Sequence, residues 1–192
     1  MPELILASTS PYRRSLLERL GVAFAAQPPQ IPEDTIPGEL PADRALRLSI
    51  AKAQAIASRR PDALVIGSDQ VAALGSQILD KPGDAARCQA QLAAASGSSA
   101  RFHTGCAVIG PRAGIRLVHL DTTTVYFRSL STAEIERYVA RERPFDCAGG
   151  FRAEGLGISL FESIESRDPT ALIGLPLIWL AGALRRAGLL LP

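Results

Sequence analysis

Short apolar runs that stop abruptly at polar residues are the sequence feature that most constrains how this chain can fold. The run at residues 3–7 meets Ser8, and the run at residues 63–67 meets Ser68. Apolar runs of about four to eight residues bounded by turn-forming residues are typical of buried strands. A helical pattern follows the first run, and it starts at Ser10, a residue type that favours helix N-termini. The chain therefore opens with a strand, a turn and a helix.

Helical and strand-like patterns alternate along the rest of the chain. We expect helices at 42–60, 85–95, 132–141 and 175–187, and further strands at 102–109, 115–127 and 158–164. The two longest strands are joined across a Gly-containing turn, as in a hairpin. Strands that alternate with helices, together with a hairpin, predict an α/β architecture around a mixed sheet. The chain has 192 residues without a repeat or linker, so we expect residues 1–192 to form one domain.

Composition and charge exclude several classes of protein. The formal net charge of +2 is too small and too evenly spread to predict a nucleic-acid-binding surface. The apolar stretches are too short to span a membrane, and the first residues do not have the pattern of a secretion signal. Three scattered cysteines without CxxC spacing favour reduced thiols. We therefore expect a cytoplasmic protein that binds neither nucleic acid nor membrane.

The segment from Ser8 to Arg14 is a candidate anion site. It places Arg13 and Arg14 in the first turn of the expected helix. Backbone N–H groups at a helix N-terminus, the helix dipole and guanidinium groups all favour phosphate at such a position. A capped surface helix with solvated arginines would have the same sequence, so this segment alone leaves both interpretations open.

The triplet Ser68-Asp69-Gln70 is a candidate catalytic centre, because it directly follows an apolar strand. Functional groups gather at the carboxyl ends of strands in open α/β sheets. A carboxylate there can hold a divalent cation or accept a proton from water. An aspartate that caps a helix would look similar, but residues 71–73 continue as strand, which weakens that alternative.

Glu33, Lys52 and Lys81 complete a set suited to the cleavage of a phosphoanhydride. Lys52 lies in an amphipathic helix beside core positions, and Lys81 opens a Lys-Pro-Gly turn. Neither lysine is specific alone, because most lysines are solvated surface residues. Together with Arg13 the lysines would neutralise phosphates, while Glu33 and Asp69 would hold a metal and activate water.

Four segments together resemble the Maf family of nucleotide pyrophosphatases. They are residues 6–14, 68–70, 80–82 and 174–177, which occur in the family's order and span nearly the whole chain. The resemblance implies a fold similar to that of inosine-triphosphate pyrophosphatases, with a mixed twisted sheet, flanking helices and two lobes around a central cleft. It also implies a nucleoside triphosphate substrate, often a homodimer, and a divalent cation. Magnesium and manganese are the main candidates for that cation, with cobalt as a third.

The resemblance also assigns roles to individual residues. Asp69 would be the proton acceptor for water, and Glu33 and Asp69 would lie near the metal. The residues expected to face the phosphates are Ser8, Arg13, Arg14, Lys52 and Lys81. Of the two arginines, the family motif favours Arg13 for the more important contact.

Three positions depart from the commonest family pattern and resemble the branch that hydrolyses 7-methyl-GTP. Gln70 stands where many members have threonine, Tyr12 where many have a basic residue, and Glu154 in a segment that replaces Tyr-Gly-Ile-Gln-Gly. Methylation at N7 makes guanine cationic, and an aromatic face attracts a cation by ~0.5–2 kcal/mol. Glu154 can accept hydrogen bonds from the N1–H and the exocyclic amine of guanine, and Gln70 could contact another base edge. The branch more often has tryptophan at the position of Tyr12.

Three alternative functions stay open at this point. The first is a family member that acts on other nucleotides, such as dTTP, UTP or 5-methyl-UTP. The second is an inhibitor of septum formation that acts by binding a partner, an effect that Asp69→Asn would preserve. The third is a nucleotide-binding module, which predicts saturable binding without release of pyrophosphate.

Overall fold

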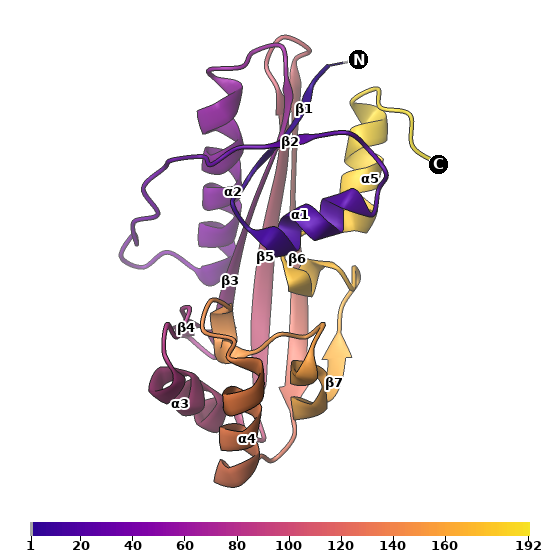
Figure 1. Ribbon diagram of the computed structural model, residues 1–192. Coiled ribbons are helices and arrows are strands. Elements are labelled where there is room, and N and C mark those ends of the chain that lie inside the picture. The colour runs from indigo at the N-terminus through magenta and orange to yellow at the C-terminus, as the bar shows by residue number, and fades with distance from the viewer. Residues whose placement is uncertain (1) are drawn as a thin grey trace. The chain divides into compact units, whose positions relative to one another are not determined.

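The computed structural model describes residues 2–192, which fall into two compact units. Unit 1 comprises the chain through Gln70 together with Thr104–Asp121 and Asp168–Pro192. Unit 2 comprises Val71–His103 and Thr122–Arg167. Each unit combines helices with its own part of the sheet (Figure 1).

The elements follow the predicted alternation of strands and helices. Unit 1 holds β1 (Leu4–Ala7), α1 (Pro11–Glu18), β2 (Ala25–Ala26), α2 (Pro41–Ala57), η3 (Ala171–Ile173) and α5 (Leu177–Arg186). Unit 2 holds β4 (Gln77–Leu79), α3 (Ala85–Ala95), α4 (Thr132–Glu142), η1 (Ala148–Gly150), η2 (Leu156–Leu160) and β7 (Phe161–Glu165). Three strands contribute residues to both units: β3 (Leu64–Leu74), β5 (Ser99–Gly110) and β6 (Ile115–Phe127).

The strands form one mixed sheet. Their order is β2-β1-β3-β5-β6-β7, with β4 beside β3. Strand β1 runs parallel to both β2 and β3, whereas the β3–β4 and β6–β7 pairs are antiparallel. A sheet with both kinds of pairing and flanking helices confirms the α/β architecture predicted from the sequence.

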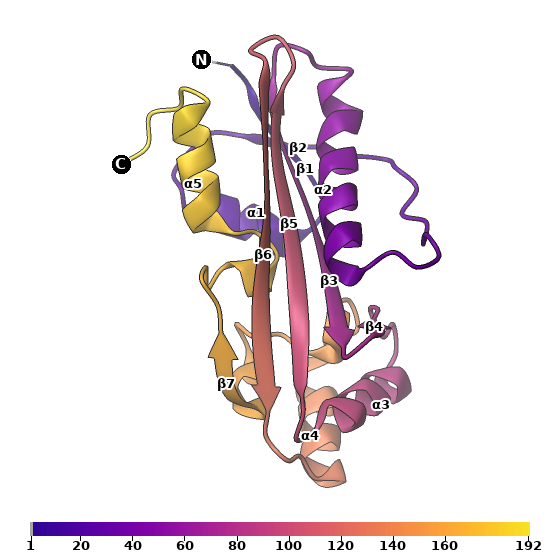
Figure 2. The ribbon, with the colours of Figure 1, turned by 180° about the vertical axis from the view of Figure 1, so that it is seen from behind.

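Helices cover both faces of the strands in unit 1, which explains why successive residues of β1 and β3 are all apolar. Leu6 and Ile66 pack with α1 and α5, for example against Leu180. The neighbouring residues Ile5 and Val65 face α2. Figure 2 shows α2 and α5 on opposite sides of these strands. Because side chains alternate between the faces of a strand, each position in β3 is assigned to one helix layer or the other.

Two glycines allow α2 to approach the sheet closely. A Cβ at Gly67 of β3 would lie 2.2 Å from the carbonyl oxygen of Ser49 in α2. A Cβ at Gly105 of β5 would lie 2.3 Å from the carbonyl oxygen of Ala45, one turn earlier in the same helix. Both positions therefore accept only hydrogen, and the helix backbone rests directly on the two strands.

Unit 2 is built around α3, α4 and a cluster of aromatic rings. Helix α4 begins with a capping box, in which Ser131 accepts the N–H of Glu134 and the Glu134 carboxylate accepts the N–H of Ser131. The ring of Phe151 meets Phe102 and Phe127 edge to face, with centroids 5.1 and 5.7 Å apart. Such pairs stabilise a core by about 0.5–1.5 kcal/mol beyond the burial of their area.

Several local predictions are confirmed. Ser10 caps α1 and Pro11 takes its first position, and Ser131 caps α4 as expected. Cys88 and Cys106 are buried free thiols.

Within residues 2–192, no helix is both long enough and apolar enough to cross a lipid bilayer.

Two predicted strand boundaries are wrong. The triplet does not stand at the carboxyl end of a strand: β3 runs through it to Leu74, which agrees with the strand-like pattern of residues 71–73 and corrects only the expected end at Ser68. The strand expected at residues 158–164 is a 3₁₀ helix up to Leu160, and only then does β7 begin. The N–H of Gly157 donates to the carbonyl oxygen of Arg152, which keeps this stretch coiled.

We expect Gly105→Ala to destabilise the protein by about 3 kcal/mol, because the new methyl group meets the backbone of α2 rather than a side chain that can move. Gly110→Ala is the matched control on the same strand, since the nearest atom there is a terminal methyl carbon of Leu64 at 3.1 Å. Urea denaturation of both variants measures the difference. Equal stabilities would contradict the close approach of α2.

Candidate functional site

The ammonium of Lys52 lies between two carboxylates. Its Nζ is 2.6 Å from Oδ1 of Asp69 and 2.8 Å from Oε1 of Glu33. Helix α2 supplies Lys52, β3 supplies Asp69, and the loop before α2 supplies Glu33. The side chains of Lys52 and Asp69 are only 8% and 9% exposed. A buried charge is costly unless it is paired, so the two side chains depend on each other.

Arg13 in the first turn of α1 brings a second cation. Its Nε donates to the carbonyl oxygen of Gly174 at 2.9 Å. Burial lowers the pKa of the Arg13 guanidinium, and the charges of Asp69, Cys106 and Glu33 oppose that shift. Two cations and two carboxylates therefore gather at one place in unit 1.

Gly174 is required where it stands. Its φ is +117°, which only glycine adopts readily, and a Cβ there would lie 3.3 Å from Nε of Arg13. The close approach lets the carbonyl oxygen of Gly174 fix the guanidinium. This explains in physical terms why a glycine begins the segment Gly174-Leu175-Pro176-Leu177.

The other two residues of the triplet lie on the opposite face of β3. Oγ of Ser68 is 2.8 Å from the carbonyl oxygens of both Gly105 and Gly174. The amide nitrogen of Gln70 lies within 3.0 Å of Oγ1 of Thr104 and of the carbonyl oxygens of Ala171 and Leu172. Ser68 and Gln70 thus hold the segment that carries Gly174.

Asp168 and Thr170 hold the same segment from its other side, and the sequence analysis did not find them. Oδ2 of Asp168 accepts the N–H of Ile178 at 2.7 Å, which caps the start of α5. Oγ1 of Thr170 lies 2.6 Å from Oδ1 of Asp168 and accepts the N–H of Leu177. Both residues are buried. The sequence carries no capping signal for them, because Asp168 and Thr170 stand well ahead of Leu177, the first residue of α5, and not directly before it.

The predicted site residues fall into four groups. Arg13, Glu33, Lys52 and Asp69 come together in unit 1, and Gln70 adjoins them on the same strand. Ser8 and Tyr12 lie beside the first turn of α1, where Oγ of Ser8 accepts the N–H of Ser10. Arg14 is exposed and pairs with Glu18 on the same helix. Lys81 and Glu154 belong to unit 2, where both are exposed. The roles proposed for all these residues stay predictions.

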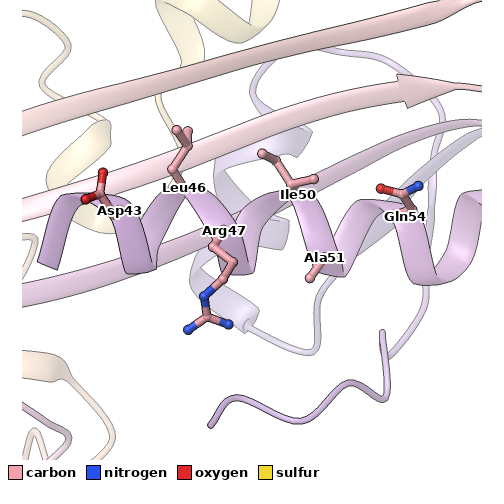
Figure 3. A pocket seen from close by; sticks show the side chains of 6 residues that line it. All are labelled: Asp43, Leu46, Arg47, Ile50, Ala51 and Gln54. Carbon is pink, nitrogen blue, oxygen red and sulfur yellow. The ribbon is translucent and has the colours of Figure 1, made fainter. Parts of the chain in front are cut away.

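An open pocket lies along α2. It is lined by Asp43, Leu46, Arg47, Ile50, Ala51 and Gln54 (Figure 3). None of these residues belongs to the predicted set, and Arg47 is bound to the carboxylate of Glu39 at 2.5 and 2.6 Å.

Within residues 2–192, no group of three His, Cys, Asp or Glu side chains could hold a metal alone.

Comparison with known proteins gives consistent matches over the whole chain. The family model described as Maf-like protein matches residues 3–187. A 7-methyl-GTP pyrophosphatase of Xanthomonas oryzae pv. oryzae is 56% identical over 193 residues, covering 100% of both chains. One of Aromatoleum aromaticum is 52% identical, covering 99% of this chain and 98% of that one. A crystal structure of a nucleoside-triphosphatase / dITP/XTP pyrophosphatase from Mycobacterium abscessus has a TM-score of 0.47 at 19% identity and covers 96% and 95% of the two chains.

We expect Gln70→Glu to destabilise the protein in the absence of any nucleotide, by about 2 kcal/mol. A carboxylate oxygen would replace the amide nitrogen against the carbonyl oxygens of Ala171 and Leu172, so donors would be lost and like charges would meet. Gln77→Glu is the control, because Gln77 is exposed. Denaturation by urea measures both variants. An unchanged midpoint for Gln70→Glu would mean that the side chain does not hold the segment.

Proposed function

Since this chain belongs to the family of Maf-like proteins, we propose that it is a nucleotide pyrophosphatase that hydrolyses 7-methyl-GTP to 7-methyl-GMP and pyrophosphate. Two kinds of evidence support this. Full-length relatives with that name share more than half of its residues. The site itself supplies the needed groups, and the observation that carries the proposal is the buried contact of Lys52 with Asp69 and Glu33.

Arg13 and Lys52 act on the phosphates. The triphosphate is strongly anionic, and cations held in a buried setting stabilise the additional charge that develops as the phosphoanhydride opens. The carbonyl oxygen of Gly174 fixes the direction of the Arg13 guanidinium, and α2 fixes Lys52. Both cations are thus set in place before the nucleotide arrives, which avoids the cost of ordering them later.

Asp69 accepts the proton of the attacking water. The oxygen of that water bonds to the α-phosphorus. The bond from this phosphorus to the oxygen that bridges the α- and β-phosphates breaks, and pyrophosphate leaves. A positioned general base of this kind typically accelerates a reaction by about 10²–10⁴-fold. Lys52 holds one oxygen of the carboxylate at 2.6 Å, which fixes its orientation.

Glu33 and Asp69 fit a divalent cation that is shared with the substrate. One ammonium contacts both carboxylates, so the pair already gathers around a cation. Magnesium commonly binds through one or two carboxylates plus substrate phosphates, and manganese and cobalt also accept carboxylate ligands. The ion would neutralise phosphate charge and polarise the phosphoanhydride.

Recognition of the nucleobase is assigned in this proposal to Tyr12, Gln70 and Glu154. Tyr12 offers an aromatic face to the cationic ring of 7-methylguanine, and Glu154 accepts hydrogen bonds from its N1–H and exocyclic amine. The amide nitrogen of Gln70 is bound inside the protein, so its contribution to the base would come from its amide oxygen. Ser8, Arg14 and Lys81 add contacts to the phosphates.

The cellular setting is part of the same proposal. We place the protein in the cytoplasm, where nucleoside triphosphates are present, and we expect residues 1–192 to act as one catalytic domain. We also expect a homodimer, as the family resemblance implies. Nucleic acid and membranes are not expected to be partners.

We expect Asp69→Asn to lower turnover of 7-methyl-GTP by at least about 10³-fold while nucleotide binding persists, because the amide cannot take the proton of water. Glu33 still pairs with Lys52 in this variant, so the fold should remain. Pyrophosphate release with magnesium or manganese measures turnover, calorimetry measures binding, and Asp62→Asn at an exposed site is the control. Turnover close to wild type would require a different base.

We expect Glu154→Gln to lower kcat/KM about tenfold on 7-methyl-GTP and much less on UTP, because uracil lacks the paired donors of guanine. The panel compares 7-methyl-GTP with GTP, dTTP, UTP and CTP for the wild type, Glu154→Gln and the exposed control Glu162→Gln. Equal losses on every nucleotide would remove Glu154 from base recognition. A wild-type preference for a pyrimidine triphosphate would overturn the proposed substrate.

A further inference from the structure

Glu154 is carried by a loop whose two ends are joined. The Glu154 loop, residues 152–160, runs from Phe151 to Phe161, whose rings meet with centroids 4.8 Å apart. Both rings also pack edge to face on Phe127 at 5.7 and 5.3 Å. The aromatic cluster therefore fixes where the loop begins and ends.

One carboxylate from α4 holds that stretch on both sides of Glu154. Oε1 of Glu142 accepts a hydrogen bond from Nη1 of Arg152 at 3.0 Å. Oε2 of Glu142 accepts the backbone N–H of Leu156 at 2.9 Å. The Glu142 side chain is only 11% exposed, so these charge-assisted bonds are shielded from water, which strengthens them.

The backbone of the loop wraps closely around this carboxylate. A Cβ at Gly155 would lie 2.7 Å from Oε1 of Glu142, and a Cβ at Gly157 would lie 2.3 Å from the carbonyl oxygen of Arg152. The N–H of Arg152 also donates to the hydroxyl oxygen of Tyr138, one turn earlier on α4. Any side chain at Gly155 would thus push the carboxylate and the loop apart.

Helix α4 is itself well fixed, so Glu142 is held from a rigid support. The capping box of Ser131 and Glu134 closes its first turn. At its other end Arg143 adopts φ +48°, and its N–H donates to the carbonyl oxygen of Val139. Glu142 is the last residue of this helix, directly beside the loop.

We propose that Glu142 is a positioning residue for base selectivity, which holds the Glu154 loop and so fixes the direction of the exposed carboxylate of Glu154. This inference rests on the proposed function, in which Glu154 reads the base. Because the aromatic cluster closes the loop by itself, loss of Glu142 would release the tip of the loop and leave the rest of unit 2 in place. The effect should therefore appear in substrate selectivity rather than in folding.

The first test is Glu142→Gln, with Glu136→Gln on the exposed face of the same helix as its control. The amide keeps the size of the side chain, loses its charge and brings N–H groups against the donors of Arg152 and Leu156. We expect KM for 7-methyl-GTP to rise about tenfold, the loss of a hydrogen bond to a charged group. The kcat for UTP should stay within about twofold of wild type, and Glu136→Gln should match wild type on both nucleotides.

A second variant keeps the charge of the Glu142 carboxylate but displaces the carboxylate from the loop. Gly155→Ala places a methyl group against the Glu142 carboxylate, and Gly182→Ala is its control, because the nearest atom there lies 3.9 Å away. Product inhibition reports separately on the binding of the base end and of the phosphate end of the substrate. In both Glu142→Gln and Gly155→Ala, inhibition by 7-methyl-GMP should weaken about tenfold, whereas inhibition by inorganic pyrophosphate should not change.

The outcomes separate this inference from the proposed function. Unchanged selectivity in both variants, equal weakening of both products, or failure of both variants to fold would each overturn the role of Glu142 in positioning. A wild-type enzyme that prefers another nucleotide would overturn the substrate assignment instead. In that case the loss of its actual preference in Glu142→Gln, relative to Glu136→Gln, would still support the inference and its retention would overturn it.

Discussion

The buried ammonium of Lys52 is the constraint on which the rest of unit 1 depends. An unpaired buried charge costs several kcal/mol, so Lys52 must keep its contacts with Asp69 and Glu33. These contacts tie α2 to β3 and to the loop that precedes the helix. They are within reach only because Gly67 and Gly105 let the helix backbone rest on the strands. Packing that looks purely structural is thus what places the carboxylate of Asp69, the proposed base.

The alternation of side chains along β3 gives neighbouring residues different tasks. Asp69 faces α2 and meets its lysine, whereas Ser68 and Gln70 face the segment around Gly174. That segment in turn directs Arg13 through one carbonyl oxygen. A single tripeptide in one strand therefore positions the proposed base directly and, through Gly174, the guanidinium of Arg13. A shift of one residue in register would exchange the two tasks and destroy both.

Much of the fold and part of the site could be predicted from the sequence, because these depend on local patterns. Apolar runs, helical periodicity and capping residues such as Ser10 and Ser131 lie within a few positions of what they specify. Residues 71–73 indicated that the strand continues, but the contacts of the polar triplet that β3 passes through could not be predicted, because the partners of Ser68, Asp69 and Gln70 are distant in sequence. Gln70 bonds to residues about a hundred positions away. Contacts that join such distant segments leave no periodic signal.

The closure of the Glu154 loop by the rings of Phe151 and Phe161 has a consequence for how such enzymes can diversify. A segment whose ends are pinned together contributes little to the frame that holds it, so its length and sequence can change at a small cost in stability. The Glu154 loop and Glu142 of α4, which binds it, form one local unit of structure. Under the proposed role of Glu154, exchange of this loop together with Glu142 would change the preferred nucleobase and leave the hydrolytic residues of unit 1 unaltered.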